Sequence, residues 1–206
     1  MEDNKFIDKY SINANDLYSE GIYDKACMMI KKYNKIFEVG CGPGYSTLSL
    51  ICNGHKVFSI DNHLSCIEHT KKLLCDAGCE IVDKVLYSNE DATIMNANIK
   101  NLNFLNKIYK LDIDMIVLWN PGQSGSENII KKCTELAIKM DKPIQIMERE
   151  INEQKAIKLL DDIAILNNVR LIEKVIIPFK WNYKDGIKLE GLNNEQIYIA
   201  IGMFFP

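Results

Sequence analysis

The sequence has no long uninterrupted apolar segment, although apolar residues make up 47% of its 206 residues. A membrane-spanning helix needs about 20 consecutive apolar residues, so we predict no membrane partner. The amino terminus, Met1 to Lys5, is charged and is not followed by the apolar segment of a secretion signal. Both absences favour a cytoplasmic protein.

Positive charge is not in excess, because 25 lysines and arginines are set against 28 aspartates and glutamates, for a formal net charge of −3. A protein that binds nucleic acid over a broad surface normally shows a basic face. The charge balance therefore argues against a broad nucleic-acid footprint and favours a small-molecule partner. A local basic groove for nucleic acid is still compatible with it.

The chain also lacks the cysteine pattern of a secreted disulfide framework. Its seven cysteines are an odd number and are scattered from Cys27 to Cys133, which is typical of a reducing compartment. His63, Cys66 and His69 lie three residues apart in a predicted helix. Residues at this spacing drift around a helix instead of converging on an ion, so we predict no metal site.

The length fits one domain spanning residues 1–206. Residues 1–33 form its amino-terminal part, which we interpret as a polar arm over 1–13 and one helix over 16–33. This part could close over a site as a lid. Tyr10 and Tyr18, which combine an aromatic ring with a polar tip, are then candidate substrate contacts.

The most informative stretch is Lys35 to Tyr45, an apolar strand that leads into a turn containing Gly40, Gly42 and Gly44. Glycine is costly in an ordinary loop, so this density indicates that a ligand approaches the backbone. A helix is predicted from Ser46. A strand, a glycine turn and a helix start form the usual nucleotide-binding corner of an α/β sheet.

The next predicted strand, 56–60, ends at Asp61. In nucleotide-binding folds a carboxylate at this separation from the glycines holds the ribose hydroxyls. A carboxylate suits that task because it accepts hydrogen bonds from two neighbouring hydroxyls. The alternative is that Asp61 caps the following helix.

The pattern E-x-G-x-G-x-G, formed by Glu38, Gly40, Gly42 and Gly44, resembles motif I of the class I S-adenosylmethionine-dependent methyltransferases. A dinucleotide site is less compatible, because Pro43 removes a backbone donor from the turn. The resemblance implies an α/β, Rossmann-like three-layer sandwich with helices on both faces of a mostly parallel seven-stranded sheet. The implied strand order is 3-2-1-4-5-7-6, and the last two strands pair antiparallel.

The strands expected after Asp61 follow this pattern along the chain. We predict the third strand over 81–86, the fourth over 112–119 and the fifth over 143–147, with helices over 127–140 and 151–166. Two apolar strands, 169–179 and 196–205, have no helix between them, so they should pair antiparallel.

The resemblance also implies the cofactor S-adenosylmethionine and its product S-adenosylhomocysteine. Residues 97–104 are similar to the family's adenine-binding stretch, with Asn98 where an acid accepts from the adenine amino group; Asp91 is a rival for that role. The expected cofactor-binding residues are Glu38, Gly40, Cys41, Gly42, Gly44, Asp61, Asn62, Asn98, Ile99 and Asn120.

Residues for substrate and catalysis are expected at the ends of the later strands. Asp114, Asn120 and Pro121 are similar to part of the family's motif IV, in which a polar side chain orients a target amine. Asn120 and Glu148 are therefore the catalytic candidates, and Pro121 and Trp181 join the two tyrosines as candidate substrate contacts.

The reaction implied is methyl transfer by in-line displacement to a nucleophile, such as an amine, on a small molecule. One alternative is a methyltransferase acting on an amino group of RNA, DNA or protein. A second is a methyltransferase-like binding or regulatory protein without turnover.

Overall fold

The computed structural model describes residues 2–82, 91–119, 126–180 and 196–206. The chain divides into two compact units. The first consists of residues 1–98 with 182–187, and the second consists of residues 99–181 with 188–206. The organisation of residues 1–206 as a single domain stays a prediction.

The first unit is built on four parallel strands in the order β3-β4-β2-β1. The two strands that flank the glycine turn are almost entirely buried, as expected of parallel strands covered on both faces. Phe37 and Phe58 are paired across them and stack with ring centroids 5.5 Å apart. The strands are β1 (Lys35–Val39), β2 (Lys56–Asp61), β3 (Ile81–Val82) and β4 (Ala92–Asn96).

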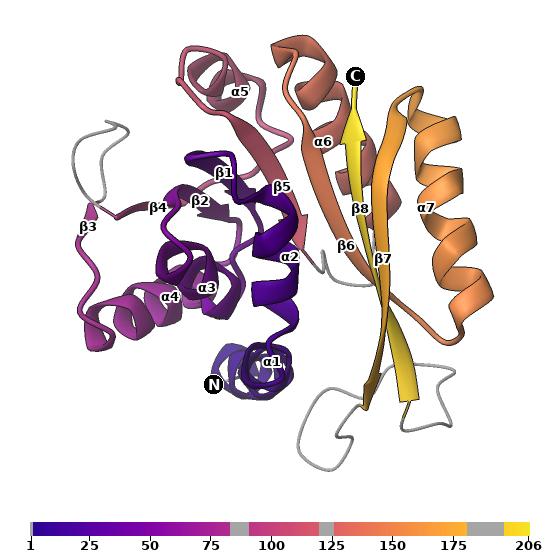
Figure 1. Cartoon of the computed structure of the whole chain (residues 1–206). Coiled ribbons are helices and arrows are strands. Elements are labelled where there is room, and N and C mark those ends of the chain that lie inside the picture. Colours follow the sequence, from indigo (N-terminus) through magenta and orange to yellow (C-terminus); the bar gives the residue numbers. More distant parts are fainter. Residues whose placement is uncertain (1, 83–90, 120–125, 181–195) are drawn as a thin grey trace. The chain divides into compact units, whose positions relative to one another are not determined.

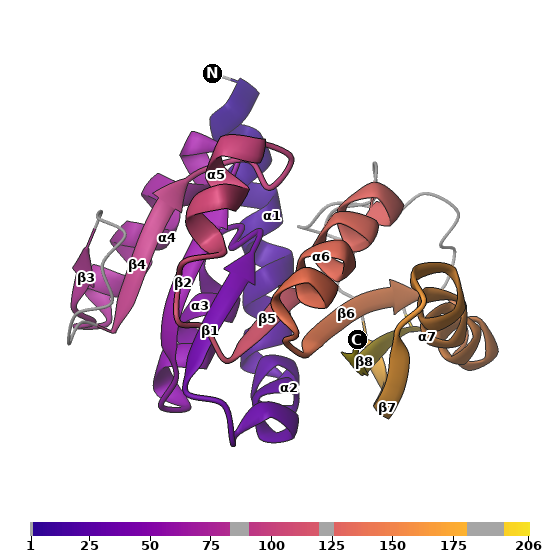
Figure 2. The ribbon, with the colours of Figure 1, turned by 90° about the horizontal axis from the view of Figure 1, so that it is seen from above.

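Four helices belong to the first unit, and their packing surrounds the glycine turn. Two of them, α3 and α4, pack against the strands β2 and β4, while α1 contacts the other three helices (Figures 1 and 2). The helices are α1 (Glu2–Ser19), α2 (Ile22–Ile30), α3 (Tyr45–Cys52) and α4 (Leu64–Asp76).

The first unit corrects three expectations. The strand beside β2 is β4, which was not predicted, while the predicted third strand is β3, and its residues 83–86 lie outside the described residues. The expected helix over 16–33 is broken at Gly21, whose φ of 66° is left-handed. The expected polar arm over 1–13 is helical from residue 2 and continues to Ser19 as α1.

The second unit contains the strands β5, β6, β8 and β7 in that order. The pair β5 and β6 is parallel, whereas β8 pairs antiparallel with both of its neighbours. The antiparallel pairing of the last two strands is thereby confirmed. The described residues thus hold eight strands where seven were expected, because β4 is additional. The strands are β5 (Met115–Trp119), β6 (Ile144–Glu150), β7 (Arg170–Lys180) and β8 (Gln196–Phe205).

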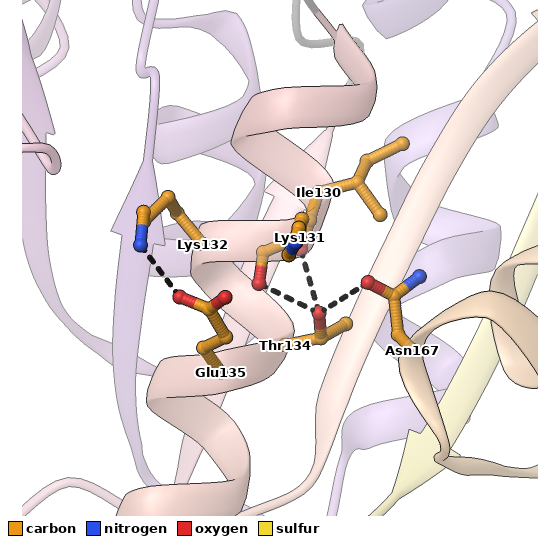
Figure 3. A network of polar contacts seen from close by, with 6 residues as sticks. All are labelled: Ile130, Lys131, Lys132, Thr134, Glu135 and Asn167. Carbon is orange, nitrogen blue, oxygen red and sulfur yellow. Dashed lines mark hydrogen bonds and ion pairs between the residues drawn. The ribbon is translucent and has the colours of Figure 1, made fainter.

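Helices α5 (Leu102–Ile108), α6 (Ser126–Met140) and α7 (Glu153–Asn167) belong to this unit, and α7 runs alongside β7 and β8 (Figure 1). Asn152 caps α7 by accepting from Lys155 N at 2.8 Å, which satisfies a free donor of the first turn. A hydroxyl joins α6 to the end of α7, where Thr134 Oγ1 lies 3.0 Å from Asn167 Oδ1 (Figure 3). The second contact ties α6 to the end of α7.

Candidate functional site

The glycine turn begins at the carboxyl end of β1 and contains three residues in left-handed conformations. The φ angles are 81° at Gly40, 51° at Gly42 and 92° at Gly44, a region that side chains strongly disfavour. The turn is anchored to β2, because Gly40 N and Cys41 N both donate to Ile60 O, at 2.7 and 3.1 Å. Its backbone is therefore held in one conformation.

The three glycines differ in what their missing side chains would meet. A Cβ at Gly44 would lie 2.9 Å from Thr70 Cα, and one at Gly42 would lie 2.8 Å from Tyr10 Cε1. A Cβ at Gly40 would meet no atom of the described residues within 4 Å. Gly44 and Gly42 thus make room for α4 and α1, whereas Gly40 borders open space at the end of β1.

Glu38 acts as an internal brace for this turn. Its carboxylate is completely buried and accepts from Ser46 Oγ at 2.5 Å, Thr47 Oγ1 at 2.6 Å and Ser59 Oγ at 2.7 Å. These bonds tie β1 to the first turn of α3 and to β2. Burial raises the pKa of Glu38, and the three hydroxyls act in the opposite direction. A direct contact between Glu38 and a cofactor stays a prediction.

Asp61 lies at the carboxyl end of β2 with unused acceptor capacity. Its Oδ2 accepts from Gly42 N at 3.0 Å and its Oδ1 accepts from His63 N at 2.8 Å. His63 is the N-cap of α4, so Asp61 supports the start of that helix from two residues away. A carboxylate has about four acceptor sites, so these two bonds leave Asp61 able to accept from two ligand hydroxyls.

Helix α1 covers the outer side of the glycine turn. Tyr10 packs over Gly42, and the Tyr18 and Tyr45 ring centroids lie 5.7 Å apart. His69 links α1 to the turn, with Nδ1 2.8 Å from Pro43 O and Nε2 3.3 Å from Ser11 Oγ. Because a carbonyl only accepts, Nδ1 carries a proton, and in the neutral ring Nε2 then accepts from the serine hydroxyl.

The remaining cofactor candidates lie along the same strand ends. Cys41 is buried, and burial raises the pKa of its thiol well above the ordinary value. Asn62 is exposed between Asp61 and the N-cap of α4. Asn98 is exposed two residues beyond β4, which pairs with β2 up to Asp61. Its rival Asp91 instead precedes β4, where its carboxylate accepts from Glu80 N at 2.9 Å.

The second unit holds the remaining candidates. Ile99, its first residue, is buried. Glu148 follows the part of β6 that pairs with β5, whose last residue Trp119 lies opposite Met147. Although the Glu148 side chain is partly exposed as a whole, its Oε1 is buried without a hydrogen-bond partner. Burial raises the pKa of this carboxyl to about 7. Three candidates, Asn120, Pro121 and Trp181, lie outside the described residues.

Several side chains that shape the site were not predicted from the sequence. The hydroxyls of Ser46, Thr47 and Ser59 hold Glu38, and His69 holds the turn. A serine and a threonine at a predicted helix start, near a buried acid, were an available signal. His69 had none, since its two partners lie 26 and 58 residues away in the sequence.

Within the described ranges, no group of three or more histidine, cysteine, aspartate or glutamate side chains could hold a metal ion. Among the helices described, none is both long and apolar enough to span a bilayer.

Comparisons with known proteins give a clear result for the fold. No family model matches the sequence, and no curated protein matches it. A proposed RNA methyltransferase from Pyrococcus horikoshii superimposes with a TM-score of 0.61 at 7% identity, over 89% of this chain and 82% of that one. Magnesium protoporphyrin IX methyltransferase from Synechocystis superimposes with a TM-score of 0.54 at 11% identity, over 93% and 79%.

The Synechocystis enzyme was solved with S-adenosylmethionine bound and also with S-adenosylhomocysteine bound. A precorrin-8w decarboxylase from Methanobacterium thermoautotrophicum is also similar, with a TM-score of 0.52 at 16% identity, over 87% of this chain and 89% of that one. The chain therefore has the Rossmann-like α/β fold of class I S-adenosylmethionine-dependent methyltransferases. At these identities the likeness concerns the fold.

Proposed function

We propose that this protein is an S-adenosylmethionine-dependent methyltransferase. The observation that supports this most directly is the corner formed by Gly40 and Asp61 at the carboxyl ends of β1 and β2. No described residue fills the space beside Gly40, and Asp61 retains acceptor sites for two hydroxyls. Ligands of open α/β sheets bind outside the carboxyl ends of the strands, and S-adenosylmethionine has a ribose with two neighbouring hydroxyls.

Each residue has a defined part in this proposal. Asp61 accepts from the ribose hydroxyls, Asn98 accepts from the adenine amino group, and the Gly40 backbone lies against the ligand. When bound, the sulfonium supplies an activated methyl group, so the protein mainly has to orient a nucleophile in line with it. Asn120 and Glu148 are the residues that we propose for the methyl acceptor.

The substrate that we propose is a small molecule, acting through a nucleophile such as an amine. The net charge of −3 supports this choice over a nucleic acid. An amino group of RNA, DNA or protein is the second candidate, supported by the similarity of Asn120 and Pro121 to the amine-orienting motif. The third candidate, a protein that binds the ligand without turnover, is distinguished by the absence of methyl transfer.

Calorimetry tests which ligand the protein binds. We expect S-adenosylhomocysteine to bind and NAD not to bind. The decisive variant is Gly40→Ala, because its added methyl group projects into the proposed site. Gly42 is less suitable for this test, since a Cβ there would collide with Tyr10.

Gly78→Ala is a matched control for Gly40→Ala. Gly78 has a φ of 80° against 81° at Gly40, and a Cβ at either position would meet no atom within 4 Å in the part of the chain that the structure describes. Both variants should therefore lose a similar amount of stability, about 1 kcal/mol from the left-handed backbone. Only Gly40→Ala should lower the affinity for S-adenosylhomocysteine, by about tenfold or more. Tight NAD binding without S-adenosylhomocysteine binding would contradict the proposal.

A further inference from the structure

A buried amide oxygen on α1 has no hydrogen-bond partner. The Asn13 side chain is 3% exposed, and no donor among the described residues reaches its Oδ1. Buried polar atoms are hydrogen-bonded in the large majority of cases, and each exception requires an explanation. Leaving such an atom unpaired costs free energy that a leucine or alanine at the same position would not cost.

Two other buried side-chain atoms among the described residues lack a hydrogen-bond partner, and neither lies beside the glycine turn on α1. His55 Nε2 lies just before β2, at the amino end of the strand and away from Asp61. Glu148 Oε1 belongs to the second unit and to the residues already proposed for the methyl acceptor. Among the described residues of the helix that covers the glycine turn, Asn13 is thus the one with an unpaired buried side-chain atom.

The helical repeat places Asn13 close to that turn. Residues three apart lie on the same side of a helix, about 4.5 Å apart along its axis. Asn13 is three residues after Tyr10, whose ring packs over Gly42. Leu17, four residues further, is buried on the same side of α1. The unpaired oxygen is therefore one helical turn from the contact between α1 and the glycine turn.

We propose that Asn13 is a further cofactor-binding residue, whose Oδ1 accepts a hydrogen bond from the α-ammonium group of the methionine part of S-adenosylmethionine. This inference rests on the proposed function. Asp61 would hold the ribose, so the amino-acid part extends from it along the glycine turn. The ammonium has three donors and a positive charge, so its binding would supply a donor for the amide oxygen that is unpaired in the ligand-free protein.

Calorimetry with two ligands tests the assignment. S-adenosylhomocysteine carries the ammonium, whereas 5′-methylthioadenosine keeps the adenine and ribose but lacks the amino-acid part. Asn13→Leu should lower the affinity for S-adenosylhomocysteine by about 10- to 150-fold, which is the range expected from losing a hydrogen bond to a charged group. The affinity for methylthioadenosine should stay the same. Asn15→Ala, at an exposed asparagine on the same helix, is the control and should change neither affinity.

Thermal unfolding provides an independent readout. Asn13→Leu removes a buried unpaired oxygen, so the ligand-free Tm should be unchanged or higher, while the Tm increase on adding S-adenosylhomocysteine becomes smaller. Asn13→Asp keeps an acceptor at this position and should retain binding, which separates the hydrogen bond from packing.

The outcomes are distinguishable. Unchanged S-adenosylhomocysteine affinity in Asn13→Leu would overturn the role of Asn13 while leaving the proposed function standing. An equal loss for both ligands would overturn the assignment to the ammonium, because the contact would then involve adenine or ribose. Failure of the unmodified protein to bind either ligand would overturn the proposed function itself, and the inference with it.

Discussion

Two acids near the ends of neighbouring strands differ in how many hydrogen bonds their carboxylates accept within the protein, and this determines which of them can bind a ligand. Glu38 is completely buried and accepts from three hydroxyls, so its capacity is largely taken up inside the unit. Asp61 accepts from two backbone amides and retains free acceptor sites. Of the two, Asp61 is the better suited to ligand hydroxyls, whereas Glu38 maintains the shape of the turn.

Glu148 gives a prediction for stability against pH. Burial raises its pKa to about 7, above the ordinary glutamate value of about 4.3. Between these values the folded protein binds more protons than the unfolded chain, so the free energy of unfolding falls as the pH rises through this window. The fall should amount to at most about 3 kcal/mol. Urea unfolding at pH 5 and pH 7.5 measures it.

Glu148→Gln should flatten this dependence, because the glutamine does not titrate. Glu153→Gln, which removes a carboxylate from an exposed position in the first turn of α7, controls for the loss of charge and should keep the slope. An unchanged slope in Glu148→Gln would mean that another group causes the pH dependence.

At the scale of elements, the contact between α1 and the glycine turn depends strongly on one side chain. His69 donates to Pro43 O and accepts from Ser11 Oγ. His69→Ala should remove both hydrogen bonds and weaken α1 docking by about 1 to 3 kcal/mol. Amide hydrogen exchange of residues 10–17 should then accelerate, since local opening becomes easier.

His63→Ala is the control for this experiment. His63 is exposed at the N-cap of α4, the helix that contains His69. Its replacement should therefore leave amide exchange in α1 unchanged. Equal protection of α1 in His69→Ala and in the unmodified protein would show that packing of the buried Ile7, Ala14 and Leu17 is sufficient to dock the helix.

The elements that sequence reasoning predicted well are those with strong local signals. The strand β1, the glycine turn and the strand β2 each combine apolar residues with a clear boundary, and the structure places them as expected. The strand β4 was missed because Ala92–Asn96 is short and is stabilised by pairing with β2, a long-range contact that propensity does not contain.

Helix α1 was underestimated for a related reason. Its buried residues Ile7, Ala14 and Leu17 are widely spaced, so its sequence shows a sparse apolar stripe. Packing against α2, α3 and α4 compensates for this, since most helical stability in proteins comes from tertiary contacts. The same limit hid Asn13, because nothing in an isolated helix shows that a polar side chain will be buried without a partner.

At the scale of the whole molecule, the fold limits the reaction less than the site does. The similar structures include methyltransferases and also a decarboxylase, and one fold commonly supports several chemistries. The proposal of methyl transfer therefore depends on the corner formed by Gly40 and Asp61. Of the two residues that we propose for the acceptor, Glu148 is described and Asn120 lies outside the described residues.

The acceptor can be tested with a labelled methyl donor added to cell extract fractionated into small molecules, RNA and protein. We expect label in the small-molecule fraction, because the net charge of −3 disfavours broad contact with phosphates. Label only in RNA or protein would contradict a small-molecule substrate. For RNA, binding should then weaken steeply with added salt, since each neutralised phosphate releases counterions. If the donor binds and no fraction is labelled, the protein is better described as a ligand-binding protein without turnover.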